Sequence, residues 1–124
     1  MRALVVAPAA SPAVQEVENT LESLQNMVGG YLECVYPFGD PVALLCNEEG
    51  KLSGLPYNRA LRTEEGKIYD IVAGTFLIVG LGEGDFADLS EELAAKYTEL
   101  YRWPEIFLTV DGKIHCVKVQ NAAE

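Results

Sequence analysis

Short apolar runs with alternating positions dominate the hydrophobic pattern of this chain, as is typical of β-strands. Runs rich in β-branched, aromatic and leucine residues predict strands at 2–7, 13–18, 31–36, 42–46 and 69–79. The second is expected to return beside the first, and the third and fourth to pair as a hairpin around the turn-rich PFGDP. The run YDIVAGTFLIV (69–79) is the most strongly β-like, so we predict one central strand buried on both faces, with Gly74 at a bulge.

Helical spacing of apolar residues follows the second predicted strand. Asn19 and Glu22 resemble a capping box in front of this spacing, which predicts a short helix at about 20–28. Gly29 and Gly30 would end it, because glycine readily takes the left-handed conformation of a helix C-cap. A single long helix beginning at Ser11 also fits the spacing, but the shorter helix is the preferred interpretation.

The last third of the chain predicts one more helix and one more hairpin. Ser90 is a good N-cap, two glutamates follow it in the first turn, and Trp103 with Pro104 would stop the helix. In FLTVDGKIHCVKV, Asp111 and Gly112 favour a type I′ turn between two alternating strands. Together these patterns predict a single α+β domain over residues 1–124, with a mostly antiparallel sheet of about five to seven strands and two short helices.

Charge limits the possible partners. The chain of 124 residues has 19 acidic and nine basic residues, hence a net charge of −10. Such a molecule repels nucleic acid phosphates and anionic membrane surfaces, so neither is an expected partner. The amino-terminal apolar run is too short for a signal-peptide core or a membrane span, and we expect a cytoplasmic protein. The three cysteines form no C-x-x-C pair, and the chain has one histidine that could join them as a metal ligand, so no disulfide framework, metal site or cofactor is expected.

Two motifs were considered for chemistry and set aside. The glycine-rich stretch 80–85 follows a strand, as phosphate-binding loops do, but its glycines are misplaced and Glu83 and Asp85 would repel an anion. His115 and Cys116 are neighbours on a predicted strand, where their side chains would point to opposite faces. No nucleophile motif is present, so the sequence assigns no catalytic residue and does not support enzymatic activity.

The acid surplus suggests a second possibility, a DNA mimic that occupies a host restriction or defence protein. Six acidic residues gather around the second predicted helix: Asp85, Asp88, Glu91, Glu92, Glu99 and Glu105. Lys96 and Arg102 interrupt them, and a solvated face that only keeps the protein soluble is the simpler explanation.

The stretch NEEGKLSGLPYNR (47–59) is the preferred contact surface. Residues 47–67 hold four of the nine bases and four acids, so this segment is neutral and the rest of the chain carries the whole net charge of −10. An anionic ligand or a partner would meet the least repulsion there. The candidate binding residues are Asn47, Lys51, Tyr57, Asn58, Arg59 and Arg62.

A structural role for the same stretch is the competing interpretation. Asn58 could close a turn, Arg59 could pair with a local glutamate, and the apolar residues could cover a sheet edge. If the stretch is a contact surface, replacing Asn58 and Arg59 by alanine should leave thermal stability nearly unchanged while abolishing partner capture. If it is structural, the same double variant should unfold.

The segments LESLQNMVGGYLE, NEEGKLSGLPYNRAL and AGTFLIVG, in this order and spacing, resemble a family of small uncharacterised proteins carried by conjugative elements, plasmids and phages, a domain of unknown function. The resemblance runs from about Val5 to Val119. It implies a host-facing or maintenance role and supplies no catalytic residues. We therefore expect a non-enzymatic accessory protein that contacts a partner or a small anionic ligand through 47–62. The alternatives are the DNA mimic and a small enzyme acting on a nucleotide.

Overall fold

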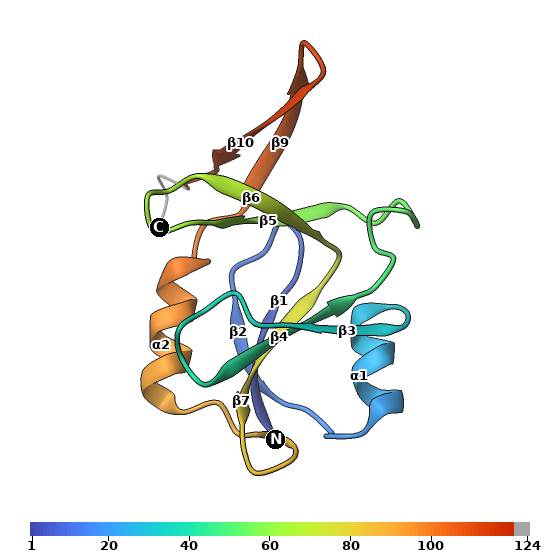
Figure 1. The fold of residues 1–124 in the computed structure, drawn as a ribbon, viewed down its shortest axis with the longest axis vertical. Coiled ribbons are helices and arrows are strands. Elements are labelled where there is room, and N and C mark those ends of the chain that lie inside the picture. The colour runs from blue at the N-terminus through green and yellow to red at the C-terminus, as the bar shows by residue number, and fades with distance from the viewer. Residues whose placement is uncertain (121–124) are drawn as a thin grey trace.

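The structure is a computed structural model that describes residues 1–120, and it contains ten strands and two helices in that part of the chain (Figure 1). In the amino-terminal half the elements are β1 (Arg2–Val6), β2 (Ala13–Glu16), α1 (Leu21–Val28), β3 (Leu32–Val35), β4 (Val42–Asn47) and β5 (Tyr57–Arg62). In the carboxy-terminal half they are β6 (Ile68–Ala73), β7 (Phe76–Leu81), β8 (Phe86–Ala87), α2 (Glu91–Leu100), β9 (Glu105–Val110) and β10 (Lys113–Lys118). The predicted α+β class is confirmed.

Six of these strands form the main sheet, in the order β2-β1-β7-β4-β3 with β8 paired to β7. All of its pairings are antiparallel. The two predicted neighbours are confirmed, since β2 returns beside β1 and β3 pairs with β4. β7 occupies the centre, between β1 and β4, and five of its six residues are buried.

The main sheet lies between the two helices, so its central strands are apolar on both faces. Leu4, Leu44 and Ile78 point to one side, where they share a core with Ala94 and Tyr97 of α2. Their direct neighbours along the strands point to the other side, where Ala3, Val5, Ala43, Leu45, Leu77 and Val79 share a core with Leu24 and Val28 of α1. The two-residue period of a strand thus divides one run of apolar residues between two cores.

Both helices begin and end with the expected chemistry, with one correction. The hydroxyl of Ser90 accepts a hydrogen bond from the Leu93 amide at the start of α2, as predicted. At α1 the cap is Thr20, whose Oγ1 accepts from the Ser23 amide at 3.2 Å, rather than the predicted Asn19. Asn19 lies one residue too early, and its amide instead donates to the Phe86 carbonyl. Gly29 ends α1 in the left-handed conformation, as expected.

The single central strand predicted over 69–79 is wrong. At Gly74 the chain turns, with φ +81°, and leaves the small β5–β6 sheet to enter β7 of the main sheet. The left-handed backbone angle favours glycine, and a Cβ at this position would lie 2.7 Å from Leu55 Cδ1, so the end of the Leu55 side chain would have to shift. Gly74 therefore joins two sheets instead of marking a bulge within one strand.

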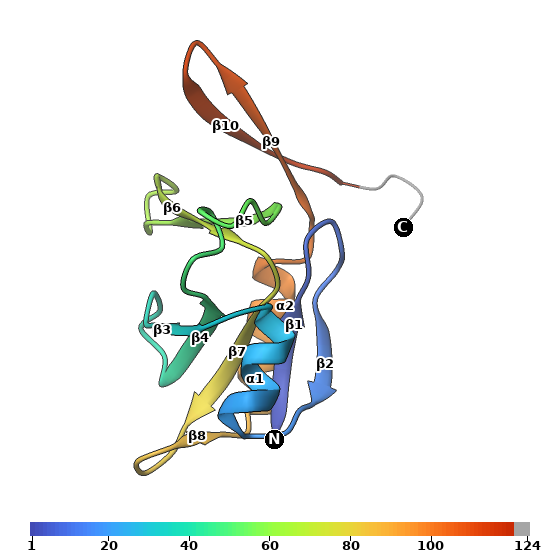
Figure 2. The same ribbon diagram turned by 90° about the vertical axis from the view of Figure 1, so that its right-hand side faces the viewer.

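Two hairpins stand outside the main sheet. β5 and β6 pair with each other and pack Leu61 and Val72 into the α2-side core. β9 and β10 form a hairpin that projects away from the rest of the molecule and leans over the β5–β6 sheet (Figure 2). Both turn residues of this hairpin have positive φ, 52° at Asp111 and 75° at Gly112, which confirms the predicted type I′ geometry.

Gly74→Ala should lower the free energy of unfolding by about 2 to 3 kcal/mol, because it adds a left-handed penalty of about 1 to 2 kcal/mol to the displacement of Leu55. Gly84→Ala is the matched control, since Gly84 has φ +73° and nothing within 4 Å of the added Cβ. The control should lose only about 1 to 2 kcal/mol. Urea unfolding followed by circular dichroism measures both, and equal losses would contradict the role given to Leu55.

Candidate functional site

The six candidate residues from the sequence do not form one surface. Asn58 and Arg59 are each 0% exposed, and both belong to β5 rather than to a loop. Asn47 is half-buried at the end of β4. Arg62 is likewise half-buried, and Lys51 and Tyr57 are exposed.

Arg59 is a buried cation held by carbonyl groups. Its Nε and Nη2 donate to the Tyr101 carbonyl at 3.2 and 2.9 Å, and Nη2 also donates to the Ala10 carbonyl at 2.6 Å. Its Nη1 donates to the backbone and side-chain oxygens of Asn58 at 3.3 and 2.8 Å. Burial lowers the pKa of the Arg59 guanidinium, and the Glu105 carboxylate opposes that shift. No local glutamate accepts a hydrogen bond from it in residues 1–120, so the predicted pairing with one is wrong too.

Asn58 and Asn47 also have structural roles. The Asn58 amide donates to the carbonyls of Val6 and Gly74, at 2.8 and 2.9 Å, and so joins β5 to β1 and to the turn between the sheets. Asn47 donates to the Val28 carbonyl at the end of α1 and accepts from the Glu49 amide. Neither amide is free for a partner.

The predicted contact surface over 47–62 is wrong for Asn58 and Arg59, which are buried. With Arg59 inside, this surface lacks its central guanidinium. The charge balance of the segment 47–67 also changes at the surface. Its four glutamates are exposed, whereas of its four bases only Lys51 and Lys67 are exposed and Arg62 is half-buried.

Cavities near the remaining candidate residues differ in charge. A cavity of about 310 Å³ between β3, β4 and β6 has Asn47 and Lys51 in its wall together with Glu33, Glu48, Glu49 and Asp70, and it repels anions. A second cavity, of about 270 Å³, lies between β6 and the β9–β10 hairpin and includes Lys51 and Tyr57. There Lys51 Nζ lies 2.5 Å from Asp70 Oδ1, so its charge is already matched.

The third cavity has the opposite character, and we call it the Arg62 cavity. It measures about 290 Å³ and is lined by Pro37, Phe38, Ala60, Leu61, Arg62, Thr63, Gly66, Tyr69, Leu100, Tyr101 and Lys118. Two of these residues are cations, three are aromatic, and none of the described residues in its lining is acidic. In a protein with a net charge of −10, this concave surface brings together two basic side chains and no carboxylate among the described residues of its lining.

Arg62 is positioned from behind by a buried carboxylate. Its Nη2 lies 2.5 Å from Glu105 Oε1, and the Glu105 side chain is only 2% exposed against 26% for Arg62. The other Glu105 oxygen accepts from the Ala60 amide at 3.2 Å. Glu105 thus fixes the guanidinium while Arg62 keeps a solvent-facing side, and Lys118, opposite Glu105 in the hairpin register, supplies a second positive charge.

Phe38 and Tyr101 give the cavity an aromatic wall that α2 holds in place. The Phe38 ring lies 4.5 Å from the Tyr97 ring and 6.4 Å from the Tyr101 ring, measured between centroids. Asp40, on the same connection as Phe38, lies 2.7 Å from Lys96 Nζ and accepts from the Tyr97 hydroxyl. These hydrogen bonds from Lys96 and Tyr97 lower the pKa of the Asp40 carboxyl, so the connection stays tied to α2 at neutral pH.

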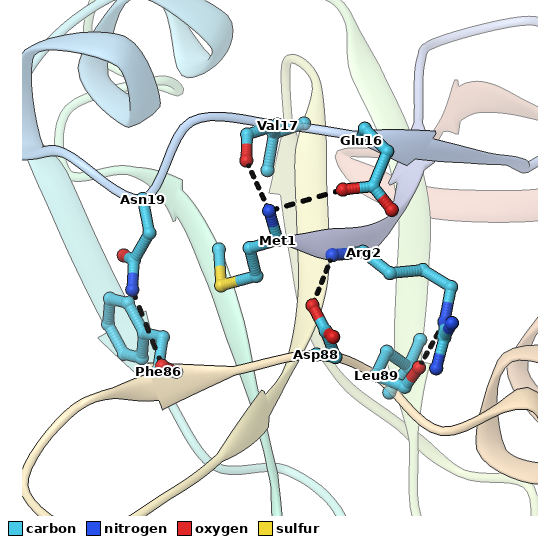
Figure 3. Close-up of polar contacts among 8 residues, drawn as sticks. All are labelled: Met1, Arg2, Glu16, Val17, Asn19, Phe86, Asp88 and Leu89. Atoms are coloured by element: carbon cyan, nitrogen blue, oxygen red, sulfur yellow. Dashed lines mark hydrogen bonds and ion pairs between the residues drawn. The ribbon is translucent and has the colours of Figure 1, made fainter.

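The last residue of the glycine-rich stretch 80–85 makes structural contacts. The side chain of Asp85 accepts a hydrogen bond from the Phe86 amide at 2.7 Å and lies 3.4 Å from the Asn19 amide. Just beyond the stretch, Asp88 accepts from the Arg2 amide, and the Arg2 guanidinium donates to the Leu89 carbonyl (Figure 3). These contacts fasten the 85–89 segment to the start of β1, and its carboxylates leave an anion no favourable place.

The cysteines and the histidine form no reactive group in the described part of the chain. Burial raises the pKa of the Cys46 thiol to about 12, with the Glu33 carboxylate adding to the effect, so it is not an activated nucleophile. His115 and Cys116 pair with different residues across the hairpin, Leu108 and Phe107, and so lie on opposite faces. Among residues 1–120 no three His, Cys, Asp or Glu side chains converge as metal ligands, and neither helix found there is long and apolar enough to cross a membrane.

The fold and cavities define an α+β protein in which an antiparallel sheet separates two helices and a basic, aromatic cleft opens beside the second of them. A comparison with protein families matches residues 1–102 to a family described as a domain of unknown function (DUF3846), and the chain belongs to that family. No curated protein and no solved structure gives a significant match. The match ends just before the β9–β10 hairpin.

Arg59→Met should lower the free energy of unfolding by about 3 kcal/mol or more, because it strands the buried carbonyls of Tyr101 and Ala10 without donors. Arg59→Lys should recover only part of the loss, since a single ammonium cannot reach acceptors on opposite sides of the guanidinium.

Arg102→Met is the matched control, because Arg102 is half exposed and its pairing with Glu99 spans 3.8 Å. Its free energy of unfolding should stay within about 0.5 kcal/mol of the parent protein. Urea denaturation of the three variants measures the differences. Equal stabilities of the Arg59→Met and Arg102→Met proteins would refute the structural role of Arg59.

Proposed function

We propose that this protein is a non-enzymatic binding protein whose Arg62 cavity takes a small ligand with one planar aromatic part and one anionic group, such as a mononucleotide. The observation that supports this most strongly is the contrast in charge between the cavities. The cavities beside 47–51 have acidic residues in their own walls, including Asp70, the partner of Lys51, whereas the carboxylate paired with Arg62 lies outside the lining of the Arg62 cavity and Lys118 adds a second cation to that lining.

The ligand class follows from the lining. A guanidinium with one side free suits a phosphate or carboxylate, and Lys118 adds a second charge without a fixed direction. Phe38, Tyr69 and Tyr101 suit an aromatic ring. A volume of about 290 Å³ is at the lower end for ligand pockets, which favours a mononucleotide over a dinucleotide or a peptide.

The side chains of the Arg62 cavity support binding of a ligand without its chemical conversion. Among residues 1–120, the cavity lining includes no histidine, cysteine or carboxylate that could transfer a proton or attack a substrate, and the hydroxyls found there belong to threonine and tyrosine. Burial raises the pKa of the Tyr101 hydroxyl above its ordinary value, so this hydroxyl keeps its proton at neutral pH and cannot act as a general base. A nucleotide-acting enzyme stays the alternative that product analysis would reveal.

The biological setting is proposed from the sequence. The resemblance to proteins of conjugative elements, plasmids and phages supports an accessory role for a mobile element, exercised in the host cytoplasm. The DNA mimic receives less support from the geometry, because three of its six acids have structural roles. Glu105 is buried against Arg62, and Asp85 and Asp88 accept hydrogen bonds from the backbone amides of Phe86 and Arg2.

Adenosine monophosphate should raise the melting temperature of the protein and bind more tightly than either adenosine or inorganic phosphate, because only the monophosphate uses both the aromatic wall and the cations. Isothermal titration should give an affinity about threefold to fivefold weaker for Lys118→Gln, the loss expected for one exposed charge pair. Lys118 is preferred to Arg62 for this test, since removing Arg62 would leave Glu105 buried and unpaired.

Lys113→Gln is the matched control, because it removes the same charge from the same strand at the far end of the hairpin. Its affinity for adenosine monophosphate should equal that of the parent protein. Equal weakening by the two variants would indicate a general charge effect and contradict the cavity. An absence of any melting shift across a mononucleotide panel would contradict the ligand class, and conversion of the nucleotide on incubation would favour the enzyme alternative.

A further inference from the structure

The β9–β10 hairpin has two different faces. In its register Glu105, Phe107 and Thr109 lie opposite Lys118, Cys116 and Ile114, and paired residues share a face. This inner face is turned toward the β5–β6 sheet: the Phe107 ring lies 5.5 Å from the Tyr57 ring, and Glu105 binds Arg62. The alternate positions form the outer face, Ile106, Leu108, Val110, Lys113, His115 and Val117.

The outer face is apolar and open. Ile106, Leu108 and Val117 are each 50% exposed and Val110 is 51% exposed, although all four are aliphatic side chains on adjoining positions of one small sheet. Both edges of this sheet are also unpaired within residues 1–120, because it has two strands only. A two-stranded hairpin gains little stability by itself, and a contiguous apolar patch on it is typical of an interaction surface.

The charge distribution indicates which partner fits. Between Glu105 and Lys118 the hairpin has two acids and two bases, so the rest of the chain carries the whole net charge of −10. The outer face itself has Lys113 and no acid. A basic partner would be drawn to the acidic body rather than to this arm. A second, equally acidic copy is repelled by the body and meets the least repulsion on the arm.

The position of the hairpin strengthens this choice. The arm projects from the body (Figures 1 and 2), so two copies joined at their outer faces would hold most of their acidic surfaces apart. Contact between identical patches is also what a twofold dimer requires. We propose that the outer face of the β9–β10 hairpin binds the same face of a second copy of this chain, forming a homodimer.

Sedimentation velocity of the full chain should show a reversible monomer–dimer equilibrium, with a dissociation constant on the order of 10 to 100 µM, as suits a small apolar contact. Raising sodium chloride from about 0.05 to about 0.5 M should tighten the dimer, because screening weakens the repulsion between two acidic bodies. A complex with an oppositely charged partner would weaken instead.

Leu108→Thr with Val117→Thr should weaken the dimer about tenfold or more, because it removes apolar area while keeping strand-forming residues. Leu52→Thr is the matched control, since Leu52 is an 89% exposed leucine outside the hairpin, and it should change nothing. If the double variant melts more than a few degrees below the parent protein, Ile106→Thr with Val110→Thr tests the same face.

Several results would overturn the dimer. These are a monomer at all concentrations up to about 500 µM, at which a contact of this size should already be populated, and a dimer weakened equally by the hairpin and Leu52 variants. Binding of the protein to neutral phosphatidylcholine vesicles would also overturn it if the double variant no longer binds them. That result would show that the outer face of the hairpin contacts lipid. A salt-tightened dimer that only the hairpin variants weaken would support it.

Discussion

The structure depends on a buried guanidinium that carbonyl groups satisfy. Arg59 is surrounded by oxygens of Tyr101, Ala10 and Asn58, so one side chain connects the end of α2, the β1–β2 turn and β5. Burying a charge is costly unless its donors have acceptors, and here the acceptors are the backbone carbonyls of Tyr101, Ala10 and Asn58 together with the side-chain oxygen of Asn58. Each of these segments must be in place before the charge is satisfied, which couples the small β5–β6 sheet to the main sheet.

This constraint also positions the Arg62 cavity. Arg59 ties β5 to the end of α2 through its hydrogen bond to the Tyr101 carbonyl, and Tyr101 forms part of the cavity wall. Three residues along β5, Arg62 emerges at the edge of the same strand and is held there by Glu105. By holding β5 in place, the buried Arg59 also positions the partly exposed Arg62 on the same strand. Glu105 is also the first residue of β9, so its contact with Arg62 holds the base of the β9–β10 hairpin against the cavity.

Much of the fold could be predicted from local patterns, because the deciding interactions are close in sequence. Ser90 caps α2 by accepting a hydrogen bond from the amide three residues ahead, and Asp111 and Gly112 form a turn between the two strands on either side of it. Gly74 was harder to interpret, since a glycine in an apolar run fits either a bulge or a turn, and only the pairing of β6 and β7 with different sheets shows that it is a turn.

The candidate site was harder still. A charged residue next to Asn58 is expected at the surface, and nothing nearby in sequence indicates that carbonyls 42 and 49 positions away accept from Arg59. The strand itself was not indicated either, because YNRALR (57–62) does not alternate between apolar and polar positions. The Arg62 cavity draws its wall from positions between Pro37 and Lys118, a grouping that only the tertiary fold creates. Of the six candidates, Arg62 alone lines it.

The location of ligand contact tests this account most directly. Adenosine monophosphate can be titrated into the isotopically labelled protein while amide nuclear magnetic resonance signals are followed. The account predicts shifts concentrated at Phe38, Arg62, Thr63, Tyr69 and Lys118, with Asn47 and Lys51 unaffected. Shifts centred on residues 47–51 or on the glycine-rich stretch 80–85, or none at saturating nucleotide, would contradict it.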